Sequence, residues 1–197
     1  DLHLSLRRQR QMCIRDSFVI TYFLLLRILT GLSPLGFFRD FYPVMAYAFS
    51  TSSSSATLPI TLETLERKMG IKKEVASFTA PLGATINMDG TAIMQGVATV
   101  FIAQVYQVDL SMMEYLMVII TATLASIGTA GVPGVGLIML AMVLQQVGLP
   151  VEGIALIIGV DRLLDMLRTA VNVSGDATIS CIVANSENQL SRKDFIS

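Results

Sequence analysis

The fold is decided by a 34-residue apolar stretch, Tyr115 to Gly148, YLMVIITATLASIGTAGVPGVGLIMLAMVLQQVG. As one continuous helix it would extend about 50 Å, whereas the hydrocarbon core of a bilayer is about 30 Å thick. Two complete crossings would need about 40 residues. Residues 128–136, at its centre, contain Pro133 and four glycines, which interrupt a helix. We therefore expect a re-entrant hairpin, whose broken tip is buried in protein or faces an aqueous cavity.

Residues 37–69 form a second stretch of the same kind, 33 residues long and interrupted by TSSSSATLP at 51–59. The composition places both stretches in lipid. The 197-residue chain is 53% hydrophobic and 15% charged, with a mean hydropathy of +0.64, whereas an ordinary soluble domain is about a quarter charged. A net charge of -1 and a pI near 5.8 exclude a nucleic-acid partner bound through a basic surface.

The basic residues orient these segments, because Lys and Arg mark the cytoplasmic side of a membrane protein. They occur at 67–73 and 192–193, and none occurs in the connections at 109–114 and 150–152. This pattern holds only if each hairpin returns to the side it entered. We predict an all-α, multi-pass protein of the cell membrane, built of an end of a transmembrane helix (18–36), a first hairpin (37–70), an unwound transmembrane helix (74–108), a second hairpin (113–148), a last transmembrane helix (151–185) and a cytoplasmic tail (186–197).

The first 17 residues differ in character from the rest of the chain. Residues 1–17 contain four arginines without a helical or strand period, and the apolar run begins abruptly at Phe18. We interpret residues 1–17 as a foreign or mis-joined tail, which is set aside in reasoning about the fold. We also expect the chain to be a fragment of a longer protein.

The last helix carries a polar stripe through an apolar segment. Its members Asp161, Asp165, Arg168, Asn172 and Asp176 are spaced by 4, 3, 4 and 4 residues. At 100° per residue they fall within an arc of about 80°. In a membrane such a stripe faces protein, ions or a water-filled cavity. A purely structural polar seam is the alternative.

The types of side chain predict a ligand. Asp165 accepts from an ammonium group, and the forked Arg168 guanidinium binds a carboxylate through two hydrogen bonds, which together suit an acidic amino acid. The segment Asn87 to Thr91, NMDGT, adds polar groups at membrane depth. Its Asn87 and Asp89, with Asn172 and Asp176, are hard oxygen donors, which favour sodium over a transition metal.

Four motifs resemble one family when taken in order. SSSSATLP (52–59), NMDGT (87–91), ASIGTAGVPG (125–134) and DRLLDMLRTAVNVSGD (161–176) are similar to the C-terminal half of the dicarboxylate and acidic amino acid:cation symporters, over residues 18–190. The resemblance implies a transporter and not an enzyme. It also implies a homotrimer in which each protomer has a fixed scaffold domain and a transport domain that moves like an elevator.

The resemblance also implies roles for individual residues. It assigns the substrate contacts to Ser54, Thr91, Val132, Asp165, Arg168, Thr169 and Asn172. It assigns one sodium site to Gly83, Asn87, Asn172 and Asp176, and a second to the backbone carbonyls of Thr85, Ser126, Ile127 and Thr129. A third site would use Asn87 and Asp89 with ligands that in the family lie outside this chain. The tip at 128–136 would be the extracellular gate, and the tip at 52–59 the cytoplasmic gate.

Two departures from the family pattern qualify these roles. An arginine that the family usually carries near the substrate aspartate is replaced by Ser52 or Met166, and Arg162 is a candidate to substitute, although its place on the helix edge counts against it. Gln95 occupies the position of a glutamate in proton-coupled animal members. Sodium-only coupling is therefore expected, although proton coupling stays open.

Three other functions remain as alternatives. The first is a proton-coupled C4-dicarboxylate carrier of the same family, since the sequence does not separate aspartate, glutamate and four-carbon dicarboxylates. The second is a fragment without function. The third is an intramembrane aspartyl protease using Asp89 and Asp176, for which the motif is weak.

Overall fold

The structure, a computed structural model, describes residues 22–127 and 131–191. These residues form helices and no strand, apart from one isolated antiparallel bridge between Ile71 and Leu190. The all-α prediction is confirmed. The elements in order are α2 (Leu24–Thr30), α3 (Pro34–Thr51), α4 (Ser54–Arg67), α5 (Lys73–Ile86), α6 (Asp89–Val105), α7 (Met112–Ile127), α8 (Val135–Gln146), the 3-10 helix η2 (Val151–Ile154) and α9 (Ala155–Ser186).

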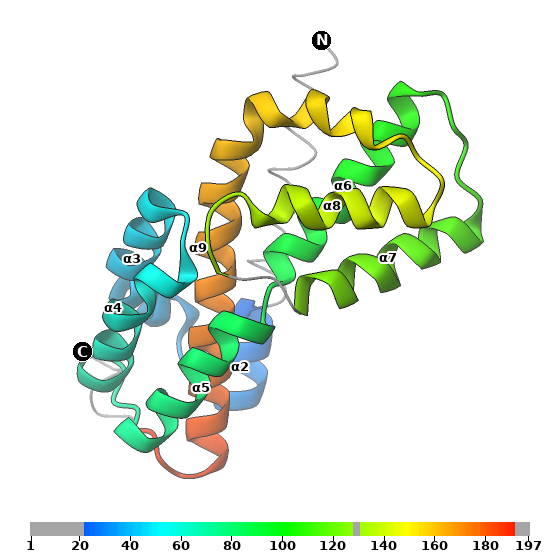
Figure 1. The fold of residues 1–197 in the computed structure, drawn as a ribbon. Helices are drawn as coiled ribbons and strands as arrows, with labels where there is room; N and C mark the ends of the chain where they lie inside the picture. The colour runs from blue at the N-terminus through cyan, green and yellow to red at the C-terminus, as the bar shows by residue number, and fades with distance from the viewer. Residues whose placement is uncertain (1–21, 128–130, 192–197) are drawn as a thin grey trace.

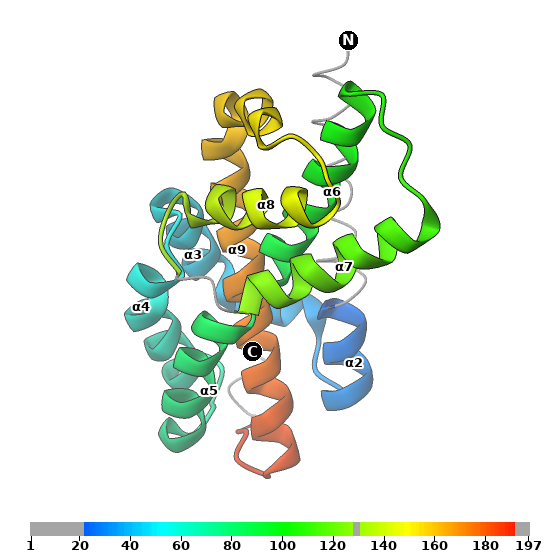
Figure 2. The ribbon, with the colours of Figure 1, turned by 45° about the vertical axis from the view of Figure 1, so that its right-hand side comes forward.

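Helix α9 is the axis of the molecule (Figure 1). It contacts α2 to α6 and, more slightly, α8. Helices α2 to α5 lie along its C-terminal half, and α6 to α8 lie beside its N-terminal half, an arrangement that the turned view in Figure 2 also shows. The long last helix thus joins two groups of helices.

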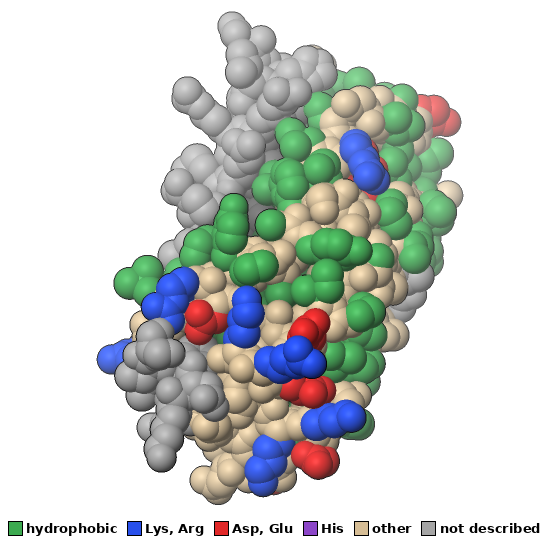
Figure 3. All heavy atoms as spheres, turned by 90° about the vertical axis from the view of Figure 1, so that its left-hand side faces the viewer, with side chains coloured by type: hydrophobic (Ala, Val, Ile, Leu, Met, Phe, Trp, Pro, Cys, Tyr) green, Lys and Arg blue, Asp and Glu red, His purple; other side chains and the backbone are tan. Residues whose placement is uncertain are grey.

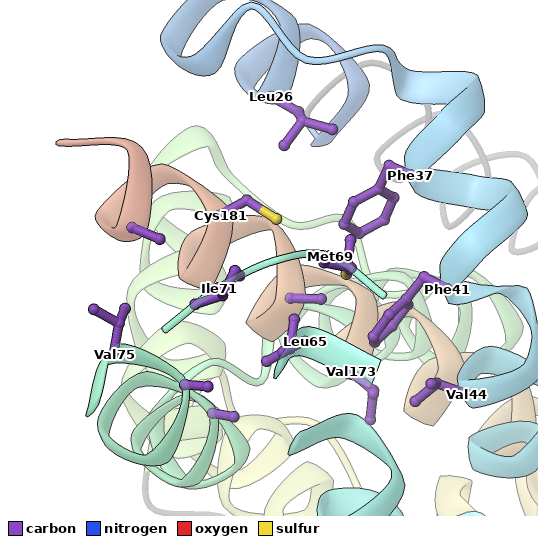
Figure 4. Close-up of a cluster of buried hydrophobic side chains, with 14 of the residues drawn as sticks. Leu26, Phe37, Phe41, Val44, Leu65, Met69, Ile71, Val75, Val173 and Cys181 are labelled. Atoms are coloured by element: carbon purple, nitrogen blue, oxygen red, sulfur yellow. The ribbon is translucent and has the colours of Figure 1, made fainter. Parts of the chain in front are cut away.

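Each group has its own hydrophobic core. The first core packs Phe37, Phe41 and Leu65 against Val173 and Cys181 of α9 (Figure 4). The second core packs α6, α7 and α8 against an earlier part of α9, and its members from that helix are at positions 157 and 164. The polar residues of α9 between positions 161 and 176 therefore lie largely between the two apolar cores.

Two helix pairs occupy the places of the predicted hairpins. Helices α3 and α4 contact each other, as do α7 and α8. The first pair starts at Pro34, three residues earlier than predicted, because the Ser33 side chain caps α3 by accepting from the Gly36 N–H group at 3.4 Å. Its interruption is also shorter than predicted, because only Ser52 and Ser53 are outside the two helices and Pro59 lies inside α4.

The surface separates charged from apolar side chains. Figure 3 shows Lys, Arg, Asp and Glu gathered toward the lower end of one face, with hydrophobic side chains over much of the rest. Large apolar residues are exposed on α7 in particular, among them Met113, Leu116, Ile120 and Leu124. Among the described residues, no helix combines the length and apolar character needed to cross a membrane.

Candidate functional site

A break between α5 and α6 begins the candidate site. Helix α5 ends at Ile86 and α6 begins at Asp89, so only Asn87 and Met88 lie between them. The interruption predicted over residues 87–91 is therefore shorter, since Asp89 and the next two residues form the first turn of α6. The backbone of Asn87 is non-helical, with φ -87° and ψ 83°. This break lets the Asn87 side chain reach α9.

The predicted ion ligands converge between α5, the break and α9. The Asn87 Nδ2 atom donates to Asp176 Oδ1 at 3.0 Å and to the Asn172 carbonyl at 3.5 Å. Gly83 lies against the same carboxylate, because a Cβ atom at this position would be 2.6 Å from Asp176 Oδ1. A glycine is needed here for the close approach of α5 to α9. The structure thus brings all four predicted members of the first sodium site together.

Asp89 lies at the N-terminus of α6, where a carboxylate is favoured by the helix dipole. Its Oδ1 atom accepts from the Gly90 N–H group at 3.2 Å, and its Oδ2 atom accepts a hydrogen bond from the Tyr22 hydroxyl. Asp89 and Asp176 therefore have different partners, and no hydrogen bond joins these two carboxylates in the structure.

Asn172 links the ion cluster to a second cluster. Its Oδ1 atom accepts from the Gly90 N–H group at 2.8 Å, and its Nδ2 atom donates to Thr91 Oγ1 at 3.3 Å and to Met88 Sδ at 3.2 Å. The side chain is thus fully engaged and 3% exposed. Its orientation is fixed by the start of α6.

The second cluster is centred on an ion pair. Asp165 and Arg168, one turn apart on α9, are 3% and 4% exposed and pair with each other. Asp165 Oδ2 also accepts from the Gly134 N–H group, at 3.0 Å. The Arg168 Nη1 atom is buried and has no hydrogen-bond partner among the described residues. A buried guanidinium nitrogen without a partner carries a desolvation cost that a ligand carboxylate would remove.

A small cavity, partly open to solvent, adjoins this ion pair. All seven residues predicted to contact substrate line it, together with three that were not assigned to the substrate, Ser52, Met88 and Gly131. The signal for Ser52 was weak, because only the structure shows its left-handed backbone, with φ 53°. Met88 lies inside the NMDGT motif, whose polar members alone point to a ligand.

The tips of the two helix pairs meet at this cavity. The Gly131 carbonyl accepts from the Ser53 hydroxyl at 2.8 Å and from the Ser55 N–H group at 3.3 Å. A Cβ atom at Gly131 would be 3.1 Å from Ser55 Oγ, so the two tips are in close contact. Two segments 78 residues apart thus close one side of the cavity together.

The motifs and this geometry agree with a family model. Residues 15–186 match the model of the sodium:dicarboxylate symporter family, which covers well over half of the chain. The chain belongs to the sodium:dicarboxylate symporter family. This family consists of transporters, so the alternative of an intramembrane protease is wrong, and membership implies a location in a membrane.

Individual members of the family are also similar to this chain. An excitatory amino acid transporter of Caenorhabditis elegans is 49% identical over 156 residues, which are 79% of this chain and 31% of that protein. Human excitatory amino acid transporter 5 is 47% identical over 87% of this chain and 30% of its own length. Rat excitatory amino acid transporter 1 is 46% identical over 89% of this chain and 33% of its own length. The chain therefore spans about a third of these curated relatives.

The second set of predicted sodium ligands lies at the ends of two helices. Thr85 is in the last turn of α5, and Ser126 and Ile127 end α7. Helices α5 and α7 contact each other, and the last carbonyls of a helix lack partners within the helix. Carbonyl oxygens at helix ends are of the ligand type that an alkali cation accepts. Thr129, the fourth member, lies outside the described residues.

The two departures from the family pattern differ in their surroundings. Arg162 is exposed and is not among the residues that line the cavity. Gln95 is fully buried, and neither of its amide atoms has a hydrogen-bond partner among the described residues. Arg168 is therefore the one cation that lines the described cavity.

Proposed function

We propose that this chain is the substrate- and ion-binding part of a symporter that moves an acidic amino acid, aspartate or glutamate, into the cell together with sodium. The observation that carries the proposal is the buried pair of Asp165 and Arg168 in a cavity closed by two helix tips. Membership of a sodium:dicarboxylate symporter family and similarity to excitatory amino acid transporters support it. The seven cavity-lining residues that the family resemblance assigns to substrate would contact it.

The pair of Asp165 and Arg168 suits an acidic amino acid, which has one ammonium group and two carboxylates. The substrate ammonium would take over Asp165, and its side-chain carboxylate would take over the Arg168 guanidinium, including the unpartnered Nη1 atom. The remaining carboxylate would face the N-termini of α4 and α8, which begin beside the cavity at Ser54 and after Gly134. One buried ion pair is thus exchanged for two, and the second carboxylate of the substrate is stabilised by the two helix N-termini.

The donors around Asp176 suit sodium as a co-transported ion. They include the Asp176 carboxylate and the Asn172 backbone carbonyl, and the Asn87 amide, which donates through Nδ2 in this structure, would turn its oxygen to the ion. Such oxygens are the hard ligands that an alkali cation accepts. The glycine at 83 keeps one side of the Asp176 carboxylate clear, since any larger residue would overlap its Oδ1 atom. The carbonyls of Thr85, Ser126, Ile127 and Thr129 would form a second site, and Asn87 with Asp89 would contribute to a third. Proton coupling is the second candidate.

The topology proposed from the sequence has support in the fold. The connection at 68–72 lies beside the residues that come after α9, since the Lys72 N–H group donates to the Gln189 carbonyl at 3.1 Å and Ser191 to Gly70 at 2.9 Å. Both segments would be cytoplasmic. At the other end, Gly153 packs against Tyr106, which places the two acidic connections together. The two helix pairs would be re-entrant hairpins of a multi-pass cell-membrane protein that works as an elevator in a homotrimer.

The decisive experiment is uptake of labelled aspartate by the transporter that contains this chain, reconstituted in proteoliposomes with sodium and proton gradients imposed separately. A sodium gradient alone should drive uptake. If an inward proton gradient alone drives it, and succinate competes, the proton-coupled dicarboxylate carrier replaces this proposal. If the 197-residue chain neither binds aspartate in sodium nor supports uptake in any assembly, it is a fragment without function.

A variant of Arg168 tests the substrate class. Arg168→Cys should abolish transport of aspartate and leave room for small neutral amino acids, because the lost pairing of a buried charge costs about 3–5 kcal/mol. Arg162→Cys is the matched control, since it removes an exposed arginine from the same helix. Unchanged aspartate affinity in Arg168→Cys would rule out the role of Arg168.

A further inference from the structure

Tyr22 joins the ion cluster from a part of the chain where no motif was found. It lies immediately before α2 and is 5% exposed. Its ring packs with Val171 of α9 and Ile93 of α6. Its hydroxyl donates a hydrogen bond to Asp89 Oδ2. Apolar contacts from two helices therefore fix the ring, and the only polar atom of the side chain points to a carboxylate.

The glycine at 175 shows how closely this hydroxyl approaches the Asn87 amide, the hydrogen-bond partner of the other carboxylate. A Cβ atom at Gly175 would be 2.5 Å from the Tyr22 hydroxyl oxygen and 2.5 Å from Asn87 Nδ2. The two polar atoms are therefore at most 5.0 Å apart. Asn87 donates to Asp176, and Tyr22 donates to Asp89. The hydrogen-bond partners of the two carboxylates therefore lie close together beside Gly175 of α9.

We propose that Tyr22 is a positioning residue of the ion site, whose hydroxyl holds the Asp89 carboxylate in place and ties the segment before α2 to the cluster of Asn87 and Asp176. A hydroxyl is well suited to this role because it donates one hydrogen bond and keeps two lone pairs. Its donation compensates the buried carboxylate, and it fixes the side chain of Asp89 before a cation arrives. The inference rests on the proposed sodium coupling.

Tyr22→Phe tests the role with the smallest change, since the ring contacts remain and only the hydroxyl is lost. Asp89 then loses a hydrogen bond that orients it, and the sodium concentration for half-maximal aspartate binding should rise about fivefold. Aspartate affinity at saturating sodium should stay close to that of the unchanged protein. The readouts are calorimetric aspartate binding at graded sodium, and the sodium-dependent rise in melting temperature without substrate.

Two further variants separate positioning from a general structural effect. Tyr42→Phe removes a hydroxyl from a tyrosine that is 57% exposed on α3, and it should change neither readout. In the double variant of Tyr22→Phe with Asp89→Asn, the sodium requirement should equal that of Asp89→Asn alone, because Tyr22 acts through Asp89. Independent structural effects would instead multiply.

Gly175→Ala provides a second route if Tyr22→Phe is recovered in low yield. Its methyl group would displace both the Tyr22 hydroxyl and the Asn87 amide, so the sodium requirement should rise at least as far as in Tyr22→Phe. An unchanged sodium requirement in folded Tyr22→Phe, or a multiplied effect in the double variant, overturns the inference alone. If the unchanged protein binds aspartate equally well in choline, the proposed sodium coupling fails as well, so the two failures are distinguishable.

Discussion

The two helix pairs start their second helices in different ways. Helix α4 begins after Ser53, whose side chain caps it by accepting from the Ala56 N–H group at 3.2 Å. Helix α8 begins after Gly134, which has a left-handed backbone with φ 83° and no side-chain cap. The N–H group of Gly134 donates instead to Asp165, a proposed substrate ligand. The start of α4 is thus capped by its own Ser53, whereas the N–H group at the start of α8 is paired through the binding site.

The packing of α4 and α8 also differs. Helix α4 contacts α3, α5 and α9 and buries polar residues such as Thr57 and Thr61. Helix α8 packs mainly on α7 and α6, and it contacts α9 only slightly. The second core thus holds this pair to α6, and the pair reaches the substrate cluster through Gly131 and Gly134 at its tip. This difference favours the α7–α8 pair as the gate that opens when substrate leaves Asp165.

The largest expected effect comes from Gly136→Ala in the second pair. A Cβ atom at this position would be 1.6 Å from Arg168 Nη1, so the buried guanidinium has to move and its pairing with Asp165 is disturbed. Aspartate binding should weaken by about 3 kcal/mol, the scale for losing a buried charge pair, because the displaced guanidinium no longer reaches the side-chain carboxylate of the substrate.

The matched control is Gly159→Ala, because a Cβ atom there meets nothing within 4 Å. It lies on α9 and should leave binding unchanged while slightly raising the melting temperature, since alanine favours a helix over glycine. Calorimetric binding of aspartate measures both variants. Equal affinities would show that α8 does not press on Arg168.

The next effect concerns the contact between the tips. Ser53→Ala removes the cap of α4 and the hydroxyl that donates to the Gly131 carbonyl, and it should lower the free energy of unfolding by about 2 kcal/mol. Ser33→Ala removes only the weaker cap of α3, at 3.4 Å, and should cost about 1 kcal/mol or less. Chemical denaturation curves in detergent compare the two. Equal losses would mean that the tip contact adds no stability.

The backbone conformations of the two tips predict smaller effects on stability, which are opposite in sign for the two tips. Gly134→Ala places a side chain at φ 83° and should destabilise the second tip by about 1 kcal/mol. Ser52→Gly relieves a left-handed backbone at φ 53° in the first tip and should stabilise it by up to about 1 kcal/mol. Melting temperatures check the signs, and a loss of stability in Ser52→Gly would indicate that its side chain matters more than its backbone.

The smallest expected effect is on the pH dependence of stability, and it arises from Glu114 in the first turn of α7. The Ser111 N–H group donates to the Glu114 carboxylate at 2.6 Å, and this hydrogen bond lowers the pKa of the exposed Glu114 below its usual value. A pKa lowered in the folded state stabilises the fold above the ordinary pKa, and this contribution is lost as the pH falls through the folded pKa. Glu114→Gln should remove that acid-dependent part of the melting curve. An unaltered pH profile would contradict it.

Much of the fold could be predicted from length and composition. The 34-residue stretch and its glycines predicted the α7–α8 pair, because glycine and proline leave few alternatives to a break. The break at 51–59 was overestimated, since Ser53 caps α4 early and the helix accommodates Pro59. Sequence could not show this, because it depends on one side-chain hydrogen bond.

The candidate site was predictable where spacing on one helix determines it. The 4-3-4-4 pattern placed Asp161, Asp165, Arg168, Asn172 and Asp176 on one buried face of α9. The ion pair between Asp165 and Arg168 was not foreseen, because a static pattern does not tell how two ligands pair without a substrate. Tyr22 was missed for a different reason: its contact spans 67 residues and belongs to no motif.

The most direct test of the α7–α8 pair as the gate is a pair of distances between spin labels, measured by double electron-electron resonance in the transporter that contains this chain. Spin labels at Ser50 and Ile138, which are exposed, report the first pair against the second, and labels at Ser50 and Ile179 report the first pair against α9. Withdrawal of aspartate and sodium should broaden and lengthen the Ser50–Ile138 distance and leave the Ser50–Ile179 distance unchanged. If the Ser50–Ile179 distance changes instead, or if neither responds, the assignment of the α7–α8 pair as the gate is contradicted.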